Sequence, residues 1–237
     1  MEPGTLVFGS LDLWVMRSVL ELRSPYLDEL MHFLLSTDIR IGLLAVLLFY
    51  AWITPHGTTR GNEAYVVKSL AAIVLAMVGC FLARHAFYQQ PRPRLVFTEL
   101  DFPPLNGLGS LVDLRSFPSD TACLAAAMTM AIFWRSRRLG TVAMLWTLAG
   151  VSFPRIYIGY HYLSDIVFGI ALGAAIALVT LNWRRATERP AQWLRTLQAK
   201  SEPGVMVLAG LIVYEIGTMF PLLQFMGGVA KSYLAHH

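Results

Sequence analysis

Charged residues are scarce in this chain of 237 residues, because Asp, Glu, Lys and Arg together make up only 14% of it. Hydrophobic residues make up 56%, and the mean hydropathy is +0.54. This composition excludes an ordinary soluble domain and is typical of a compact helical membrane protein. The length accommodates one domain of about six spans, since each crossing needs roughly 20 residues.

Cysteine and basic clusters are scarce as well. Cys80 and Cys123 are the only cysteines, and both stand in apolar stretches. They offer neither a disulfide framework nor a zinc-site spacing, so we expect buried free thiols. The net charge of +4 comes from dispersed basic residues, which gives no indication of a nucleic-acid partner. The first ten residues lack a basic region, so we expect no cleavable signal peptide.

Long apolar segments are abundant. We expect spans at residues 39–54, 65–84, 118–134, 140–154, 162–183 and 204–224. They predict an all-α, polytopic membrane helical bundle that forms a single domain over residues 1–237, with its transmembrane core at 37–237. Within the fifth span, Gly169 and Gly173 have the spacing that lets a neighbouring helix approach closely.

Residues 1–36 mix apolar and charged positions, unlike the spans that follow. Apolar residues recur there at helical spacing, namely Leu11, Trp14, Val15, Val19 and Leu22. This pattern predicts one or two amphipathic helices that lie in the membrane interface, with a break near Ser24 and Pro25. A first crossing helix is the alternative, and the interspersed charges disfavour it.

Basic loops predict the orientation of the bundle. One loop runs from Arg135 to Arg138, and residues 184–200 carry five further basic residues. The positive-inside rule assigns these loops to the cytoplasmic side. The connections at 85–118 and 155–162 then lie on the opposite face. We therefore expect an integral protein of a bacterial inner membrane with its functional face toward the periplasm or the outside.

The connection at 155–165 reads Arg-Ile-Tyr-Ile-Gly-Tyr-His-Tyr-Leu-Ser-Asp. His161 and Asp165 are four residues apart, which places them on one face of a helix. A carboxylate fixes the tautomer of a neighbouring imidazole and makes its free nitrogen a better nucleophile, while the Arg155 guanidinium can hold a phosphate. The three residues predict phosphoryl transfer through a phosphohistidine. A simple surface pair of His161 and Asp165 is the alternative interpretation.

Two further segments accompany this array, His-Ala-Phe-Tyr-Gln-Gln-Pro-Arg-Pro at 85–93 and Phe-Pro-Ser-Asp-Thr at 117–121. In order and spacing the three segments resemble the signatures of the type 2 phosphatidic acid phosphatase (PAP2) superfamily. That family usually shows Lys-x6-Arg-Pro, Pro-Ser-Gly-His and Ser-Arg-x5-His-x3-Asp. The third signature is the most specific, and the first two are matched in part.

The resemblance implies a role for each matching residue. His161 is the expected nucleophile, Asp165 orients it, and Arg155 and Arg92 clamp the phosphate oxygens. Ser119 is expected to bind phosphate through its hydroxyl, together with the amides of the helix that it begins. A helix cap is the alternative for this serine, and both roles are compatible. No metal and no cofactor are implied.

Three positions depart from the family pattern. His85 stands where the family has Lys, and it is the expected phosphate ligand or substitute proton donor there. Thr121 replaces the usual general-acid His, and its hydroxyl is too weak an acid for that task. Asp120 replaces the usual Gly, and its ionised carboxylate repels phosphate and is no acid.

The missing acid favours one class of substrate. A phosphate monoester expels an alkoxide, which leaves poorly without a proton. A diphosphate expels a phosphate group whose second pKa is about 6, so it needs little assistance. We therefore expect a preference for a lipid diphosphate, with polyprenyl diphosphate as the substrate. If His85 supplies the proton instead, this preference disappears.

Three functions stay open on the sequence. The first is a membrane lipid phosphatase. The second is a phosphotransferase that passes the phosphate from polyprenyl diphosphate to a lipid acceptor such as lipid A. The third is a catalytically degenerate relative that binds or moves lipids. The partners in all three are membrane lipids, and the oligomeric state is undetermined.

Overall fold

The computed structural model describes residues 9–35, 37–54, 62–87, 90–105, 114–183, 188–200, 208, 211–212 and 214–216. Its elements are, in chain order, α1 (Ser10–Glu21), α2 (Pro25–Leu35), α3 (Thr37–Arg40), α4 (Gly42–Ile53), α5 (Asn62–Ala86), α6 (Pro93–Val96), α7 (Asp120–Arg135), α8 (Arg137–Trp146), the π-helix η3 (Thr147–Ser152), α9 (Phe153–Tyr157), α10 (Leu163–Asn182) and α11 (Glu188–Lys200). Every regular element of these residues is helical, which confirms the predicted all-α class.

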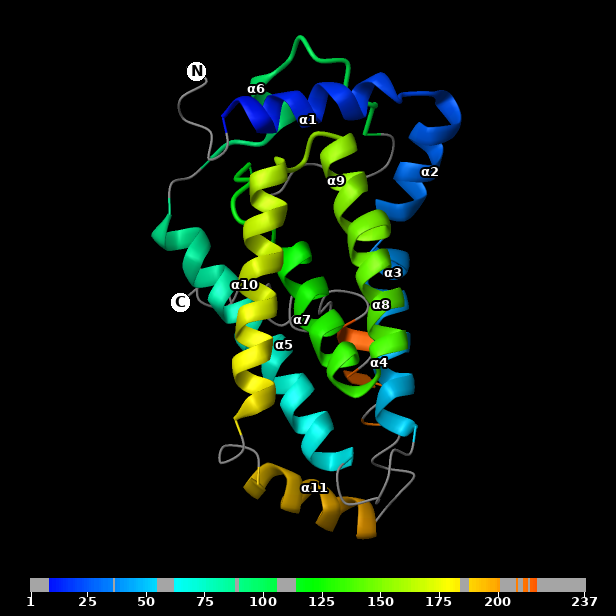
Figure 1. Ribbon diagram of the computed structural model, residues 1–237, viewed down its shortest axis with the longest axis vertical. Helices are drawn as coiled ribbons and strands as arrows, with labels where there is room; N and C mark the ends of the chain where they lie inside the picture. The colour runs from blue at the N-terminus through cyan, green and yellow to red at the C-terminus, as the bar shows by residue number, and fades with distance from the viewer. Residues whose placement is uncertain are drawn as a thin grey trace, which may run out of the picture.

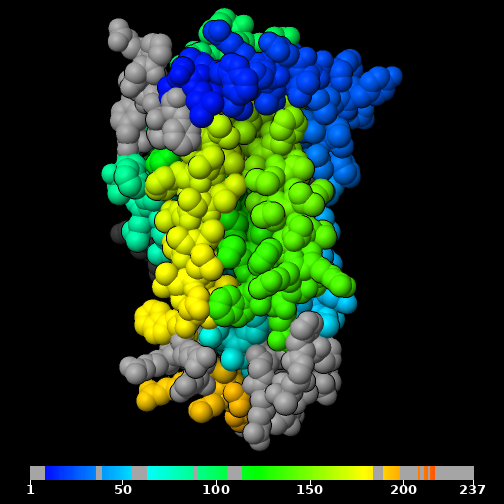
Figure 2. Space-filling view, viewed as in Figure 1, coloured from blue at the N-terminus to red at the C-terminus, as the bar shows by residue number. Residues whose placement is uncertain are grey.

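Helix α7 forms the centre of the bundle, and α5, α10, α4 and α8 pack around it (Figure 1). Almost every residue of its first three turns is buried. Alanines are frequent there, and their small side chains let the neighbouring helices approach closely. Figure 2 shows α8 and α10 side by side over this core, with α1 and α2 covering one end.

Two glycines set the contact between α7 and α10. A β-carbon on Gly169 would lie 2.6 Å from the carbonyl oxygen of Ser119, and one on Gly173 would collide with the backbone of Cys123. The expectation of a close helix approach is thereby confirmed. Because of this close contact, the first turns of α7 and α10 lie together at one end of the bundle, which we call the site end.

Helices α8, η3 and α9 form one continuous rod of 21 residues, Arg137–Tyr157. Pro154 has no N–H to donate to the preceding turn, and the wider π-turn of η3 lies directly before it. The hydroxyl of Ser152 donates to the carbonyl of Thr147 at 2.7 Å within that turn. The rod is longer than the span expected at 140–154, and its last turn brings Arg155 to the site end.

Three of the described helices are long and apolar enough to cross a membrane, at Glu63–Ala86, Arg137–Tyr157 and Leu163–Asn182. Helix α4 is apolar but shorter. These agree with the expected second, fourth, fifth and first spans. The expected span at 118–134 corresponds to α7, which its neighbours enclose. Most of the sixth, at 204–224, lies outside the described residues, so the count of six stays a prediction.

Helix α1 lies across the site end of the bundle, over α9 and α10 (Figure 1). Asp12 and Met16 are buried on one side of it, whereas Leu11, Trp14 and Leu22 are exposed. Helices α1 and α2 separate near Ser24 and Pro25, where the break was expected, and the placement of an apolar face in the membrane interface stays a prediction.

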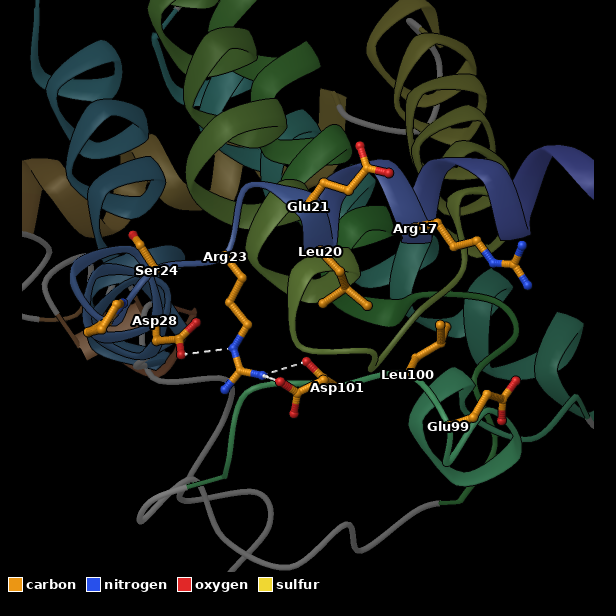
Figure 3. A pocket seen from close by; sticks show the side chains of 10 residues that line it. Arg17, Leu20, Glu21, Arg23, Ser24, Asp28, Glu99, Leu100 and Asp101 are labelled. Carbon is orange, nitrogen blue, oxygen red and sulfur yellow. Dashed lines mark hydrogen bonds and ion pairs between the residues drawn. The ribbon is translucent and has the colours of Figure 1, made fainter.

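The corner between α1 and α2 is held by Arg23, as Figure 3 shows. Its Nε donates to Asp28 at 3.1 Å, and its Nη1 donates to the carbonyl of Asp101 at 2.7 Å and contacts that residue's carboxylate. The hydroxyl of Tyr157 donates to Asp28 at 2.6 Å. These bonds join α1, α2, α9 and the segment at 99–101 around a groove of about 740 Å³.

Candidate active site

The chain turns back on itself between α9 and α10. Gly159 has a φ of +71°, and a β-carbon there would collide with the ring of Phe102, so glycine suits this turn. The amides of Tyr160 and His161 both donate to the carbonyl of Arg155, at 2.9 and 3.2 Å. This returning loop brings His161 back beside Arg155, although six positions separate them.

The segment of the first signature lies against the returning loop. Arg92 donates through Nη1 to the carbonyl of Tyr160 at 3.2 Å, and its guanidinium stacks over the Tyr160 ring at 5.2 Å. Arg94 donates from its amide to Gly159 at 3.1 Å and from Nη1 to Ile158 at 2.9 Å. The first and third signatures are therefore fixed to each other through the backbone of the loop.

The second signature joins the other two. The amide of Ser116 donates to the carbonyl of Gln90 at 2.7 Å, and the amide of Ser119 donates to the carbonyl of Asp165 at 3.3 Å. The structure thus brings three segments that are distant in the sequence to the site end of the bundle. Hydrogen bonds of the backbone hold all three segments, so this convergence does not depend on any single side chain.

The two ring nitrogens of His161 have different partners. Nδ1 lies 2.8 Å from the carbonyl oxygen of Ser116, and Nε2 lies 3.0 Å from Nη1 of Arg155. A carbonyl only accepts hydrogen bonds and a guanidinium only donates them. These contacts assign the proton to Nδ1 and leave the lone pair on Nε2. Nε2 consequently carries the free lone pair, and it faces the arginine.

Asp165 lies behind the ring. Its Oδ2 is 3.5 Å from Nδ1 of His161 and accepts the amide of Tyr162 at 2.8 Å. The carboxylate is completely buried. Ser116 is the closer partner of Nδ1, so a backbone carbonyl and the expected Asp165 share the orientation of the imidazole. No sequence signal points to a backbone carbonyl.

Burial lowers the pKa of His161. The Asp165 carboxylate opposes this effect, and the positive charge of Arg155 adds to it. Desolvation is the largest cause, because a buried imidazolium loses the hydration that stabilises its charge in water. A lowered pKa favours the neutral imidazole over the imidazolium.

Thr121 and Asp120 complete the surroundings of Arg155. Nη2 of Arg155 donates to the hydroxyl of Thr121 at 2.5 Å, and that hydroxyl donates to Asp120 at 3.1 Å. The Asp120 carboxylate also accepts the amide of Thr121 at 2.6 Å. Among the described residues Nε of Arg155 has no hydrogen-bond partner, which leaves a buried donor for an anion.

Ser119 caps α7, as one of its two expected roles requires. Its side chain accepts the amide of Ala122 at 3.4 Å, and Asp120 accepts the amide of Thr121. Two first-turn amides that we expected to bind phosphate are therefore paired within the protein. A phosphate-binding role of the Ser119 hydroxyl stays a prediction.

The structure places Arg84 at the site and His85 away from it. Nδ1 of His85 contacts the carbonyl of Phe81 at 2.8 Å, and the imidazole is exposed beside the Phe81 ring. Arg84 donates to the carbonyl of Pro118 at 3.3 Å and lies 3.4 Å from the Asp120 carboxylate. Sequence reasoning missed Arg84, and its position next to His85 was the available signal.

The site is nearly closed. His161 is 1% exposed and Arg155 6%, whereas the side chain of Asp120 is 35% exposed. Of the residues bonded around Arg155, Asp120 is therefore the most exposed to solvent. In the part of the chain that the structure describes, no three His, Cys, Asp or Glu residues gather as metal ligands.

The sequence profile of the PAP2 superfamily matches residues 65–189, which is more than half of the chain. The chain belongs to the PAP2 superfamily. The matched region contains most of α5, all of α7 and α10, and all three signature segments. The groove at the α1–α2 corner lies on segments outside or beside these signatures.

Two curated proteins and one solved structure are similar to this chain. Undecaprenyl-diphosphatase BcrC of Bacillus subtilis (strain 168) is 26% identical over 154 residues, which cover 65% of this chain and 72% of the relative. Bacitracin transport permease protein BcrC of Bacillus licheniformis is 26% identical over 177 residues, covering 72% and 79%. The crystal structure of Aquifex aeolicus LpxE has a similar fold, with a TM-score of 0.52 and 19% identity over 73% of this chain and 96% of that one.

Proposed function

We propose that this protein is a membrane lipid phosphatase that hydrolyses a polyprenyl diphosphate through a phosphohistidine at His161. One observation carries the proposal: Nδ1 is bound to Ser116, so Nε2 presents its lone pair to Arg155. A nucleophile and an anion-binding group therefore meet at one point. The similarity to an undecaprenyl-diphosphatase supports the choice of lipid.

In the first step, Nε2 attacks the terminal phosphorus of the diphosphate. A P–N bond forms, the bond to the bridging oxygen breaks, and the polyprenyl monophosphate leaves with the electron pair of that oxygen. Arg155 moves from Nε2 to the oxygens of the transferred group, which also satisfy its unpaired Nε. Arg92 and Arg84 add positive charge around the same group, in the manner usual for phosphoryl transfer.

The residues around the leaving group favour the diphosphate. The Thr121 hydroxyl accepts from Arg155 and directs its own proton to Asp120. It is not a usable acid, so the leaving group departs without a proton. A phosphate group does this far more readily than an alkoxide, because its second pKa is about 6.

In the second step, water attacks the phosphohistidine. The P–N bond breaks and inorganic phosphate forms, while the electron pair returns to Nε2. The proton that the attacking water loses is taken up by solvent, because the Asp120 carboxylate is already occupied by Arg84 and by the amide and hydroxyl of Thr121.

The orientation of the bundle determines from which side of the membrane the substrate reaches the site. The basic turn between α7 and α8 and the basic helix α11 lie at the end opposite the site end (Figure 1). By the positive-inside rule the site then faces the periplasm or the outside of a bacterial inner membrane. The whole chain, residues 1–237, acts as one membrane domain in this proposal.

The test is phosphate release by the purified protein in lipid nanodiscs, from undecaprenyl diphosphate and phosphatidic acid side by side. We expect release from the diphosphate and little from the monophosphate. His161→Ala abolishes release, and His85→Ala, an exposed histidine at the same end, leaves it nearly unchanged.

Equal release from both lipids would contradict the leaving-group argument. Release that survives His161→Ala would contradict the phosphohistidine. If no phosphate is released until lipid A is added, and the phosphate then appears on lipid A, the protein is a transferase and the hydrolase proposal fails.

A further inference from the structure

Asp12 of α1 is bound to the first turn of α10. Its Oδ1 accepts the amide of Ser164 at 2.9 Å, and its Oδ2 accepts the Ser164 hydroxyl at 2.8 Å. Both side chains are almost completely buried, at 0% and 1% exposure. A pair of bonds thus joins residues that are 152 positions apart.

The bonds of Asp12 help to cap the N-terminus of α10. The first amides of a helix have no partner within it and need an outside acceptor. The N-cap of α10 is Tyr162, which is not one of the favoured capping residues. Asp165 accepts the amide of Tyr162, and Asp12 accepts the amide of Ser164. Two carboxylates, one of them from another helix, therefore cap the turn.

A buried carboxylate is costly unless its surroundings compensate its charge. The N-terminus of α10 supplies that compensation, because the helix dipole is positive there and Ser164 gives two donors. The same turn carries Asp165, directly after Ser164 in the chain, and Asp165 contacts His161. Asp12 consequently binds the first turn of α10, which also carries Asp165, the partner of His161.

We propose that Asp12 is a positioning residue, which fixes the first turn of α10 and thereby aligns Asp165 with Nδ1 of His161. Asp12 acts on the site indirectly, through its two bonds to Ser164 in the first turn of α10. The catalytic part of this inference rests on the proposed phosphatase function.

The first arm of the test compares kcat and KM on undecaprenyl diphosphate for Asp12→Asn, Asp12→Ala and Ser164→Ala. Glu21→Gln is the matched control, since Glu21 is an exposed acid of the same helix. We expect kcat to fall about tenfold with either change at Asp12, the order of effect known for orienting partners in metal sites. KM stays within about twofold, because substrate contacts remain, and Ser164→Ala has the smaller effect because its amide persists.

The second arm is independent of activity. Protein with ¹⁵N-labelled histidine in nanodiscs reports the two ring nitrogens of His161, which are assigned by the loss of their signals in His161→Asn. We expect Asp12→Asn to shift the titration midpoint of His161 to lower pH, because a displaced Asp165 supports the imidazolium less. Arg155 and Arg92 also lower the pKa of this imidazole, and Asp12→Asn leaves both of these residues in place. Glu21→Gln leaves the midpoint unchanged.

The proposal is overturned if the changes at Asp12 lower only the melting temperature, with kcat and the His161 titration unaffected. Asp12 is then a structural cap and no more. Wild-type protein that hydrolyses neither lipid refutes the proposed function, and the titration of His161 still decides the role of Asp12.

Discussion

The first and third signature segments differ in how their residues meet the site. In the third segment, Nε2 of His161 lies 3.0 Å from Nη1 of Arg155, and Nδ1 of His161 lies 3.5 Å from Oδ2 of Asp165. In the first, His85 turns away to the carbonyl of Phe81, and its neighbour Arg84 takes the place beside the site.

Backbone geometry explains the difference. His161 lies in the loop before α10, so the prediction that His161 and Asp165 share one helix face is wrong, although the two side chains do meet. The loop through Gly159 returns His161 to Arg155, and the backbone of this loop therefore fixes the positions of the array. At the end of α5, by contrast, consecutive residues differ by about 100° around the helix axis. Alignment with the family motif therefore identifies the helical turn that lies near the site. It does not decide whether Arg84 or His85 points toward the site.

Among the changes that test the difference between the two segments, Asp165→Asn is expected to lower kcat the most. The Asn amide cannot support Nδ1–H as a carboxylate does, and the analogous change in the serine-protease triad lowers kcat by about 10⁴. Here Ser116 also holds Nδ1, so we expect a loss of about a hundredfold to a thousandfold in kcat for undecaprenyl diphosphate. Glu99→Gln, at an exposed loop position, is the control. A loss below fivefold would show that Ser116 orients the imidazole alone.

A smaller effect separates the two neighbours on α5. Arg84→Gln removes a positive charge next to the transferred phosphate, and we expect kcat/KM to fall about tenfold to a hundredfold. His85→Gln at the exposed neighbour is expected to change it by less than about twofold. Steady-state phosphate release by both variants checks this pair. A larger loss of kcat/KM in His85→Gln than in Arg84→Gln would assign the role of the family lysine to His85. It would contradict the difference between the first and third signature segments described above.

The smallest expected effect is on pH dependence. Because burial lowers the pKa of His161, the neutral nucleophile persists below the ordinary value of about 6.5. We expect the acid limb of kcat/KM to lie below that value, with activity lost as the pH falls through the lowered pKa. Asp165→Asn moves the limb further down, since the carboxylate opposes the lowering. An acid limb above 6.5 would show that a different group controls activity.

Much of the fold followed from the sequence, because apolar segments and motif spacing report directly on helices and on a common site. The class, several spans, the close approach at Gly169 and Gly173 and the convergence of the signatures were predicted in this way. Arg84 was not, because its inward direction depends on the rotation of α5. Ser116 acts through a carbonyl that every residue possesses. Asp12 looked like one charge of an amphipathic helix.

The bond between Asp12 and Ser164 also orders the steps of biosynthesis. Asp12 leaves the ribosome 152 residues before its partner, which at about 5–20 residues per second means a delay of roughly 8–30 s. During that time Asp12 lacks the Ser164 amide and hydroxyl that it accepts in the folded protein. The bond between α1 and α10 therefore forms only after α10 has been made, and so does the contact of Asp165 with His161. Truncated chains that stop before α10 therefore lack both Asp165 and the contact that holds the first helix.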